Sequence, residues 1–168
     1  MVKQASLSII EDTENHKFLM IKHLRGINKG FVNFCGGKME EGETMDDCVR
    51  RETFEETGIT IENPKRVGYV EFAPMGYNVT IYKSTKFHGT PHAREGEVEL
   101  FWQDIDKIPF EKMRKGDEDY LTEILKGKYV KKRYTYDEKG DIVSIVPLIL
   151  EEWEKQLQRQ SQIFEKNT

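Results

Sequence analysis

The spacing of hydrophobic and polar positions along this chain changes repeatedly between a strand-like and a helical period. Short apolar runs bounded by turn residues predict strands at 5–10, 17–22, 31–35, 67–72, 79–89, 97–103, 129–136 and 141–146. Apolar residues at three-to-four-residue steps predict helices at 44–58, 118–127 and 147–168. This interleaving predicts an α/β sandwich, in which a mixed sheet lies between the first helix and the later ones.

The helix expected at 44–58 has start and stop signals at both ends. Thr44 is an N-cap candidate with Asp47 three residues later, and Gly58 stands where a left-handed cap ends a helix. One face of this helix carries three carboxylates at positions i, i+3 and i+4, namely Glu52, Glu55 and Glu56.

Two explanations account for this concentration of negative charge. It is either a solvated acidic face, with Arg50 and Arg51 as local partners, or a set of ligands for a hard divalent cation. Mg²⁺ is the cation expected in the second case, because it prefers oxygen ligands.

The order of residues around the carboxylates favours the cation. Gly37 is followed at fixed intervals by Glu43, Arg51-Glu52, Glu55-Glu56, Gly58 and Ile59. This order reproduces the Nudix box, and the chain therefore resembles the Nudix hydrolases; Thr53 alone replaces a usually aliphatic position. The resemblance implies an α/β/α Nudix fold and cleavage of a nucleoside diphosphate linked to another group, with Mg²⁺ or Mn²⁺.

The same resemblance implies a set of metal ligands: Gly36, Gly37, Glu52, Glu55, Glu56 and Glu97. Arg51 is expected to orient a box glutamate, and Glu43 to play a structural or outer-shell part. The carboxylate from outside the box comes from Glu95, Glu97 or Glu99, of which Glu97 is favoured. The four glutamates and Arg51 are the predicted catalytic residues.

Over residues 5 to 146 the chain looks most like the oxidised-purine nucleoside triphosphate diphosphatases, the 8-oxo-dGTPases. This narrower resemblance implies substrate contacts from Asn33, Phe72, Asp117, Glu118 and His23. Asn33 is equally well explained as an edge or turn residue, and His23, which replaces a pocket lysine, as a surface residue. Arg114 stands where mammalian members have a tryptophan that stacks on the base.

The expected reaction is hydrolysis of a nucleoside triphosphate, such as 8-oxo-dGTP, to the monophosphate and pyrophosphate, as sanitation of the nucleotide pool linked to DNA repair. Pro74 and Tyr77 are weak signals for two alternatives, ADP-ribose and dinucleoside polyphosphate hydrolysis. A third alternative is a Nudix-like domain that binds nucleotide without turnover.

Net charge, apolar content and cysteine count indicate which classes of partner and compartment to expect. The formal charge of −4 argues against a nucleic-acid polymer and leaves a small-molecule nucleotide, provided that bound cations offset the acidic site. No run approaches the ~18 apolar residues of a membrane span. Two cysteines and an N-terminus without a signal-like pattern favour the reducing cytoplasm.

We expect residues 1–146 to form the Nudix domain and 147–168 a helical extension. Leu150, Trp153, Leu157 and Phe164 give this extension an apolar stripe. The stripe packs either on the same domain or on a second subunit, so the chain is expected to be a monomer or a homodimer.

Overall fold

The computed structural model describes residues 1–166, and the side chains of residues 1–160. Its strands are β1 (Lys3–Asp12), β2 (Lys17–His23), β3 (Val32–Asn33), β4 (Cys35–Lys38), β5 (Thr60–Glu62), β6 (Lys65–Ala73), β7 (Tyr77–Ser84), β8 (Lys86–His88), β9 (Val98–Asp104), β10 (Val130–Tyr136) and β11 (Ile142–Pro147). Its helices are α1 (Met45–Thr57), α2 (Asp117–Leu125) and α3 (Glu152–Lys166), with 3₁₀ turns at Ile105–Lys107 and Phe110–Lys112.

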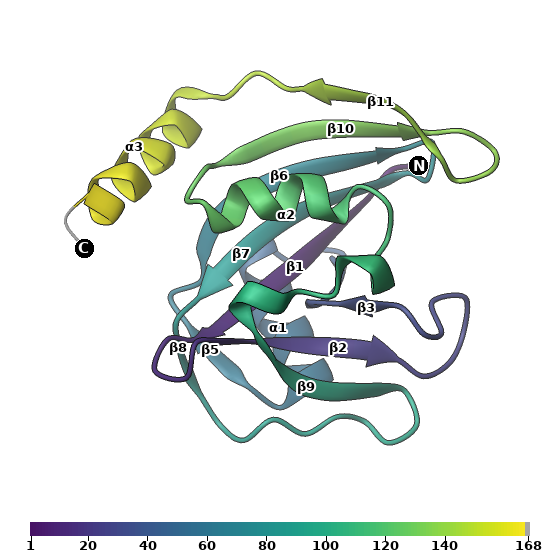
Figure 1. Cartoon of the computed structure of the whole chain (residues 1–168), viewed down its shortest axis with the longest axis vertical. Helices are drawn as coiled ribbons and strands as arrows, with labels where there is room; N and C mark the ends of the chain where they lie inside the picture. Colours follow the sequence, from purple (N-terminus) through teal and green to yellow (C-terminus); the bar gives the residue numbers. More distant parts are fainter. Residues whose placement is uncertain (167–168) are drawn as a thin grey trace.

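Nine of these strands form one mixed sheet (Figure 1), with the main order β11-β10-β6-β7-β1-β2-β3. Off this path, β4 pairs with β1 and β9 pairs with β2. The β1–β7 and β6–β10 pairs are parallel, whereas the other pairs of this sheet are antiparallel. The remaining strands, β5 and β8, form a separate two-stranded sheet.

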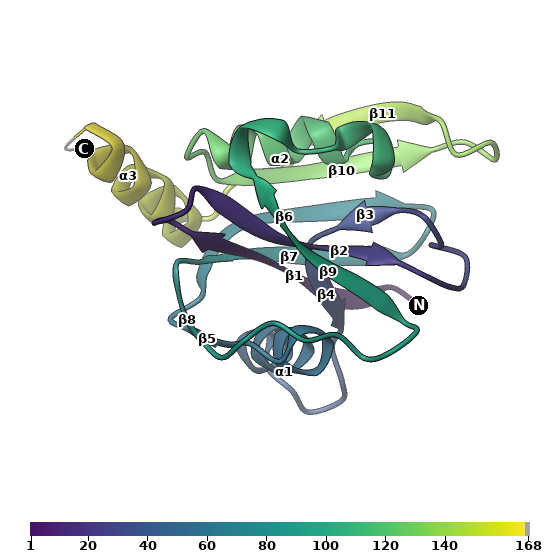
Figure 2. The same cartoon turned by 60° about the horizontal axis from the view of Figure 1, so that its bottom comes forward.

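The sheet lies between two helices, as Figure 2 shows, with α1 against one face and α2 against the other. Each face has its own apolar cluster: Val49 of α1 belongs to one cluster, and Leu121 and Ile124 of α2 belong to the other. The predicted α/β/α sandwich is therefore confirmed. Among the described residues, no helix is long and apolar enough to cross a membrane.

Strand β2 contributes to both clusters because neighbouring side chains of a strand point to opposite faces. Phe18 and Met20 pack in the cluster beneath α2, whereas Leu19 and Ile21 pack in the cluster beneath α1. All four side chains are almost fully buried, which is worth roughly 1.5–3 kcal/mol for each of them. This doubly buried strand fixes the centre of the domain, and β9 pairs along it.

Helix α1 has the predicted caps. The Thr44 hydroxyl accepts a hydrogen bond from the Asp47 backbone N–H at 3.1 Å, and Gly58 has a left-handed backbone with φ of 72°. Thr53 is fully buried, where its hydroxyl oxygen accepts a weak hydrogen bond from the Cys35 thiol. A threonine at this aliphatic position of the box is thus accommodated because its polar atom has a partner.

Two predicted strands are divided. The segment 31–35 becomes β3 and the start of β4, because the Asn33 side-chain oxygen accepts the Phe34 N–H and the chain crosses from a pairing with β2 to one with β1. The segment 79–89 becomes β7 and β8, and β8 leaves the main sheet to pair with β5. Both breaks come from pairing between distant segments, which local hydrophobic spacing does not reveal.

The C-terminal helix begins later than its apolar stripe predicts. Residues up to Pro147 continue β11, and α3 begins at Glu152, so the helical start at 147 and Leu150 as a helical position are wrong. The cause is the pairing of β11 with β10, which extends to Pro147 opposite Lys132. Phe164 lies outside the residues whose side chains are described.

The first turn of α3 is attached to β10 and to the start of β6. Lys131 donates to the buried Glu154 carboxylate at 2.7 Å, and the Arg66 guanidinium lies 4.8 Å from the Trp153 ring centroid. Trp153 also meets Tyr129 edge to face. Beyond these contacts α3 extends away from the sheet (Figure 1).

Candidate active site

The acidic face of α1 lines a cavity of about 400 Å³ at the end of β2. Its lining consists of His23, Arg25, Gly26, Gly36, Glu52, Glu55, Glu56, Arg94, Glu97 and Val98. Three carboxylates come from one helix, and the fourth comes from the loop just before β9. We call this space the acidic cavity.

Arg51 holds two of these carboxylates in place. Its Nη1 donates to Glu52 at 2.9 Å and to Glu55 at 3.3 Å. Its Nε and Nη2 donate to the two oxygens of Glu43 at 2.7 and 3.0 Å, a bidentate pair. The paired guanidinium lowers the pKa of Glu43 to about 2, so this anchor stays charged at neutral pH.

The two glycines ahead of the helix differ in their surroundings. A Cβ atom on Gly37 would lie 2.2 Å from the Glu52 carboxylate, and one on Gly36 would lie 2.1 Å from the Ser6 carbonyl oxygen. Glycine at 37 therefore lets the carboxylate approach the backbone, whereas glycine at 36 lets β4 approach β1. Gly36 lines the acidic cavity, and the Gly37 carbonyl accepts a weak bond from the Cys48 thiol.

Glu56 is the carboxylate whose charge is least compensated. Burial, followed by the nearby charges of Glu52 and Glu97, raises its pKa from 4.5 to about 7, although its Oε2 accepts the Gly36 N–H at 3.1 Å. Glu97 is better compensated, because Arg25 donates to it at 2.6 Å. The cavity thus concentrates negative charge around Glu56.

The donor set of the cavity fits a hard divalent cation. Carboxylate and backbone carbonyl oxygens are the ligands that such ions prefer, and four glutamates with Gly36 supply them here. The carboxylates are instead bonded to Arg51, to Arg25 and to the Gly36 N–H. Within the described part of the chain, no three acidic, histidine or cysteine side chains are already assembled as a metal site. A cation would therefore have to draw them together.

The raised pKa of Glu56 predicts how cation binding depends on pH. Below pH 4.5 Glu56 is protonated in both the folded and the unfolded chain, and the folded state keeps its full stability. As pH rises from 4.5 through 7, Glu56 ionises more readily in the unfolded chain than in the folded one, so the folded state loses stability. A cation relieves that cost, so Mg²⁺ should raise the melting temperature more at pH 8 than at pH 5. Thermal unfolding at both values tests this, and an equal Mg²⁺ effect would contradict it.

Of the three candidate carboxylates outside the box, one lies at the acidic cavity and two do not. Glu97 lines the acidic cavity, whereas Glu95 and Glu99 are exposed and are not part of its lining. His23 also lines the cavity, and burial together with the Arg114 charge lowers its pKa, which keeps the imidazole neutral at neutral pH.

Sequence reasoning missed two cations of the cavity, Arg25 and Arg94. Both lie in loops, outside any periodic pattern and outside the box. Arg25 meets Glu97 across 72 positions of sequence, a contact that no local spacing indicates.

Of the predicted substrate contacts, His23 lines the acidic cavity, whereas the other four lie outside its lining. Phe72, on β6, packs in an aromatic group whose other members are Tyr120, Tyr134 and Tyr136. Asp117 joins this group, since its buried carboxylate accepts the Tyr120 hydroxyl at 2.7 Å. Asn33 lies on the edge strand β3, and Glu118 is exposed in the first turn of α2.

Asp117 has an unusual protonation equilibrium for a carboxylate. Burial raises its pKa to about 6, although it accepts hydrogen bonds from Tyr120 and from the Arg114 N–H. Arg114 itself is exposed, and its guanidinium lies 4.1 Å from the centroid of the Phe31 ring. This cation–π contact links the loop before α2 to the loop before β3.

Comparison with known proteins shows the family to which the chain belongs. A family model described as the NUDIX domain matches residues 2–124. The oxidized purine nucleoside triphosphate hydrolases of Danio rerio and Mus musculus are 33% and 32% identical to the chain, over 64% and 71% of its length and 70% and 79% of theirs. A solved structure of a MutT protein from Bacillus halodurans matches with a TM-score of 0.72 and 25% identity, over 86% of this chain and 96% of that one. The chain belongs to the Nudix hydrolase family.

Proposed function

We propose that this Nudix hydrolase converts a nucleoside triphosphate to the monophosphate and pyrophosphate, and that its substrates are oxidised purine nucleotides such as 8-oxo-dGTP. The observation that carries the proposal is the convergence of Glu52, Glu55, Glu56 and Glu97 on one cavity. The curated relatives support the choice of substrate, because two of them are oxidized purine nucleoside triphosphate hydrolases.

The four glutamates and Gly36 would hold Mg²⁺, or Mn²⁺, and a bound cation of this kind neutralises charge on the phosphate oxygens and activates water. Arg51 keeps Glu52 and Glu55 at the cavity and is itself fixed by Glu43. We assign it a positioning role, because its donors are occupied by carboxylates and by the Lys38 carbonyl.

The phosphate chain would enter beside the cations that line the cavity. Arg25 and Arg94 offer donors for anionic oxygens, whereas neutral His23 offers a hydrogen bond without charge. When a cation takes up Glu97, the Arg25 guanidinium would be released to contact phosphate. Arg25 and Arg94 would thus add positive charge beside the phosphate chain, in addition to that of the bound cation.

We propose that the base is bound by Asn33, Phe72 and the acidic pair Asp117 and Glu118. The Asn33 oxygen already accepts the Phe34 N–H, which leaves its NH₂ group to donate to a base acceptor. A carboxyl group whose pKa is about 6 can also donate a proton to a base edge when it is protonated. Phe72 provides an aromatic surface next to Tyr120, the residue whose hydroxyl donates to Asp117.

Asn33→Ala is expected to reduce discrimination between bases by about tenfold, because one hydrogen bond to the base is lost. The maximal rate on the best substrate should change much less, since no ligand of the phosphate chain is altered. Measurement of kcat/KM for 8-oxo-dGTP, dGTP and dATP tests this. An unchanged ratio between the three substrates would remove Asn33 from the base site.

A turnover panel tests the proposed function as a whole. The panel contains 8-oxo-dGTP, the common nucleoside triphosphates, ADP-ribose and a diadenosine polyphosphate, each with Mg²⁺ and detection of released phosphates. We expect the highest kcat/KM for an oxidised purine nucleotide. Preference for ADP-ribose or a dinucleotide would move the assignment to those classes, and no turnover on any member would favour a binding module.

The physiological setting belongs to the same proposal. We propose small-molecule nucleotides rather than a nucleic-acid polymer as substrates, a monomer or homodimer as the active form, and sanitation of the nucleotide pool in the cytoplasm as the role. The negative net charge supports the first part. Cys35 and Cys48, which are buried as free thiols, are compatible with a reducing compartment.

A further inference from the structure

The side chains of Arg25 and Glu97 form an ion pair in the acidic cavity. Arg25 Nη2 donates to Glu97 Oε1 at 2.6 Å, and both residues line the cavity. Their side chains are 69% and 40% exposed, so solvent reaches the pair. Glu97 is also one of the four glutamates that we propose as ligands of a divalent cation. The arginine therefore occupies a carboxylate that the cation would use.

The backbone keeps these two residues side by side, whichever partners their side chains have. His23 lies opposite Val98 at the end of the pairing between β2 and β9. The next residue, Leu24, continues that pairing, because its N–H donates to the Glu97 carbonyl at 3.0 Å. A change of side-chain partner would thus leave Arg25 beside Glu97 and close to the cavity.

The Arg25 side chain has room to leave this carboxylate. The following residue, Gly26, has a left-handed backbone with φ of 75°, and a Cβ atom there would meet nothing within 4 Å. The loop is therefore open to solvent at this point, and the guanidinium can turn by rotation about its own side-chain bonds. Because an exposed ion pair contributes little to stability, its exchange for another pair requires little free energy.

The charges around the pair indicate where Arg25 would turn. Glu97 lies close enough to Glu56 for its charge to raise the pKa of that residue, so the two carboxylates face a common space. Ligation of a divalent cation there would neutralise the charge that holds Arg25 on Glu97. A polyphosphate beside the same cation would offer new anionic oxygens, and a guanidinium binds such oxygens in a bidentate manner.

We propose that Arg25 exchanges its partner, from Glu97 to the polyphosphate, and thereby couples cation binding to nucleotide binding; this role rests on the function proposed above. In the cation-free chain, Arg25 competes with the cation for Glu97 and weakens cation binding. In the cation-bound chain, the released guanidinium strengthens polyphosphate binding. The two effects have opposite signs, which an ion pair with a purely structural role would not produce.

Arg25→Gln is expected to bind Mg²⁺ about threefold more tightly than the original chain, because Glu97 loses a competing partner. Isothermal titration calorimetry with Mg²⁺ alone measures this effect without a nucleotide, so the result does not depend on the substrate. In a Glu97→Gln background the same substitution should leave the Mg²⁺ affinity unchanged, since the paired carboxylate is gone. Equal Mg²⁺ affinity of Arg25→Gln and the original chain would overturn the proposal.

The same variant is expected to bind polyphosphate more weakly. Imidodiphosphate, a diphosphate that resists hydrolysis, should bind about tenfold more weakly to Arg25→Gln in saturating Mg²⁺, and the nucleotide KM should rise similarly while kcat changes much less. Arg25→Lys should restore part of this affinity, because it keeps the charge but not the bidentate geometry. Undiminished imidodiphosphate affinity in Arg25→Gln, or no binding by the original chain, would contradict the exchange.

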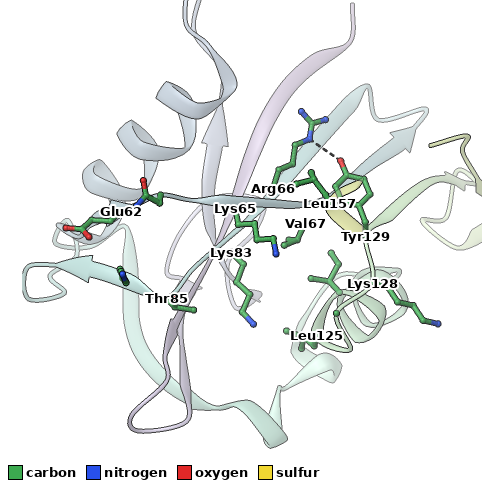
Figure 3. Close-up of a pocket in the computed structure, with 14 residues that line it drawn as sticks. Glu62, Lys65, Arg66, Val67, Lys83, Thr85, Leu125, Lys128, Tyr129 and Leu157 are labelled. Carbon is green, nitrogen blue, oxygen red and sulfur yellow. Dashed lines mark hydrogen bonds between the residues drawn. The ribbon is translucent and has the colours of Figure 1, made fainter. Parts of the chain in front are cut away.

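Two matched variants remove the same charge elsewhere. Lys29 is exposed in the same loop but outside the lining of the acidic cavity. Lys128 lies at a second cavity, of about 480 Å³, which shares no lining residue with the first (Figure 3). Lys29→Gln and Lys128→Gln should bind Mg²⁺ and imidodiphosphate like the original chain. Changes as large as those in Arg25→Gln would show that net charge alone sets these affinities, and would overturn the proposal.

Discussion

Glu56→Gln is expected to lower nucleotide turnover by about 10³-fold while leaving the fold intact. The amide keeps the shape of the side chain and can still accept the Gly36 N–H, which the carboxylate accepts at 3.1 Å. It removes the charge that would bind a cation. The substitution also removes a carboxyl group whose pKa is raised to about 7 and which is charged and buried at pH 8. The melting temperature without metal should therefore rise at pH 8.

Glu41→Gln provides a matched control for this variant. Glu41 is exposed in the turn before α1 and is not part of the acidic cavity, so the substitution changes the net charge equally without touching the site. Its turnover should equal that of the original chain. A Glu56→Gln enzyme that retains more than a tenth of its activity, or one that unfolds, would contradict the assigned role.

Removal of divalent cations is expected to lower nucleotide turnover as much as Glu56→Gln does. Dialysis against EDTA should abolish turnover, because the four glutamates then repel the polyphosphate that they are meant to bind through a cation. Addition of Mg²⁺ or Mn²⁺ in excess should restore the rate completely. The measurement is the initial rate of pyrophosphate release before chelation, after it and after metal is added back.

Two further observations make the chelation experiment specific. Circular dichroism before and after EDTA should coincide, which separates loss of metal from loss of fold. Glu41→Gln should require the same Mg²⁺ concentration as the original chain, whereas Glu52→Gln should require more, since one ligand is lost. Persistent turnover in EDTA would exclude the proposed mechanism.

The parts of the fold that sequence predicted well are those set by nearby residues. Helix α1 has the predicted N-cap at Thr44 and C-cap at Gly58, because capping depends on side chains within one turn. The continuous apolar run Phe18 to Ile21 likewise predicted a strand, and the structure shows that this strand is buried on both faces.

The features that sequence could not predict depend on distant partners. The break at Asn33 exists because β3 pairs with β2 and β4 pairs with β1. The delayed start of α3 at Glu152 follows from the pairing of β11 with β10. Hydrophobic spacing reports which positions are buried, but it does not report which strand lies beside which.

In the candidate site too, contacts between nearby residues could be predicted from sequence, whereas contacts between distant residues could not. Glu52, Glu55 and Glu56 share a helix face, so their proximity follows from helical geometry alone. The contact of Arg25 with Glu97 could be seen only in the folded chain, because it joins two separate loops. Loop residues of this kind carry no periodic signal before the fold is known.

The phosphorus NMR spectrum of 8-oxo-dGTP after incubation with the full chain and Mg²⁺ is the decisive measurement. Cleavage between the α and β phosphorus atoms predicts two products, 8-oxo-dGMP and pyrophosphate, with neither formed by Glu56→Gln in the same time. Release of inorganic phosphate with 8-oxo-dGDP, or an unchanged triphosphate spectrum, would contradict the proposal that the acidic cavity binds a cation and directs water to this bond.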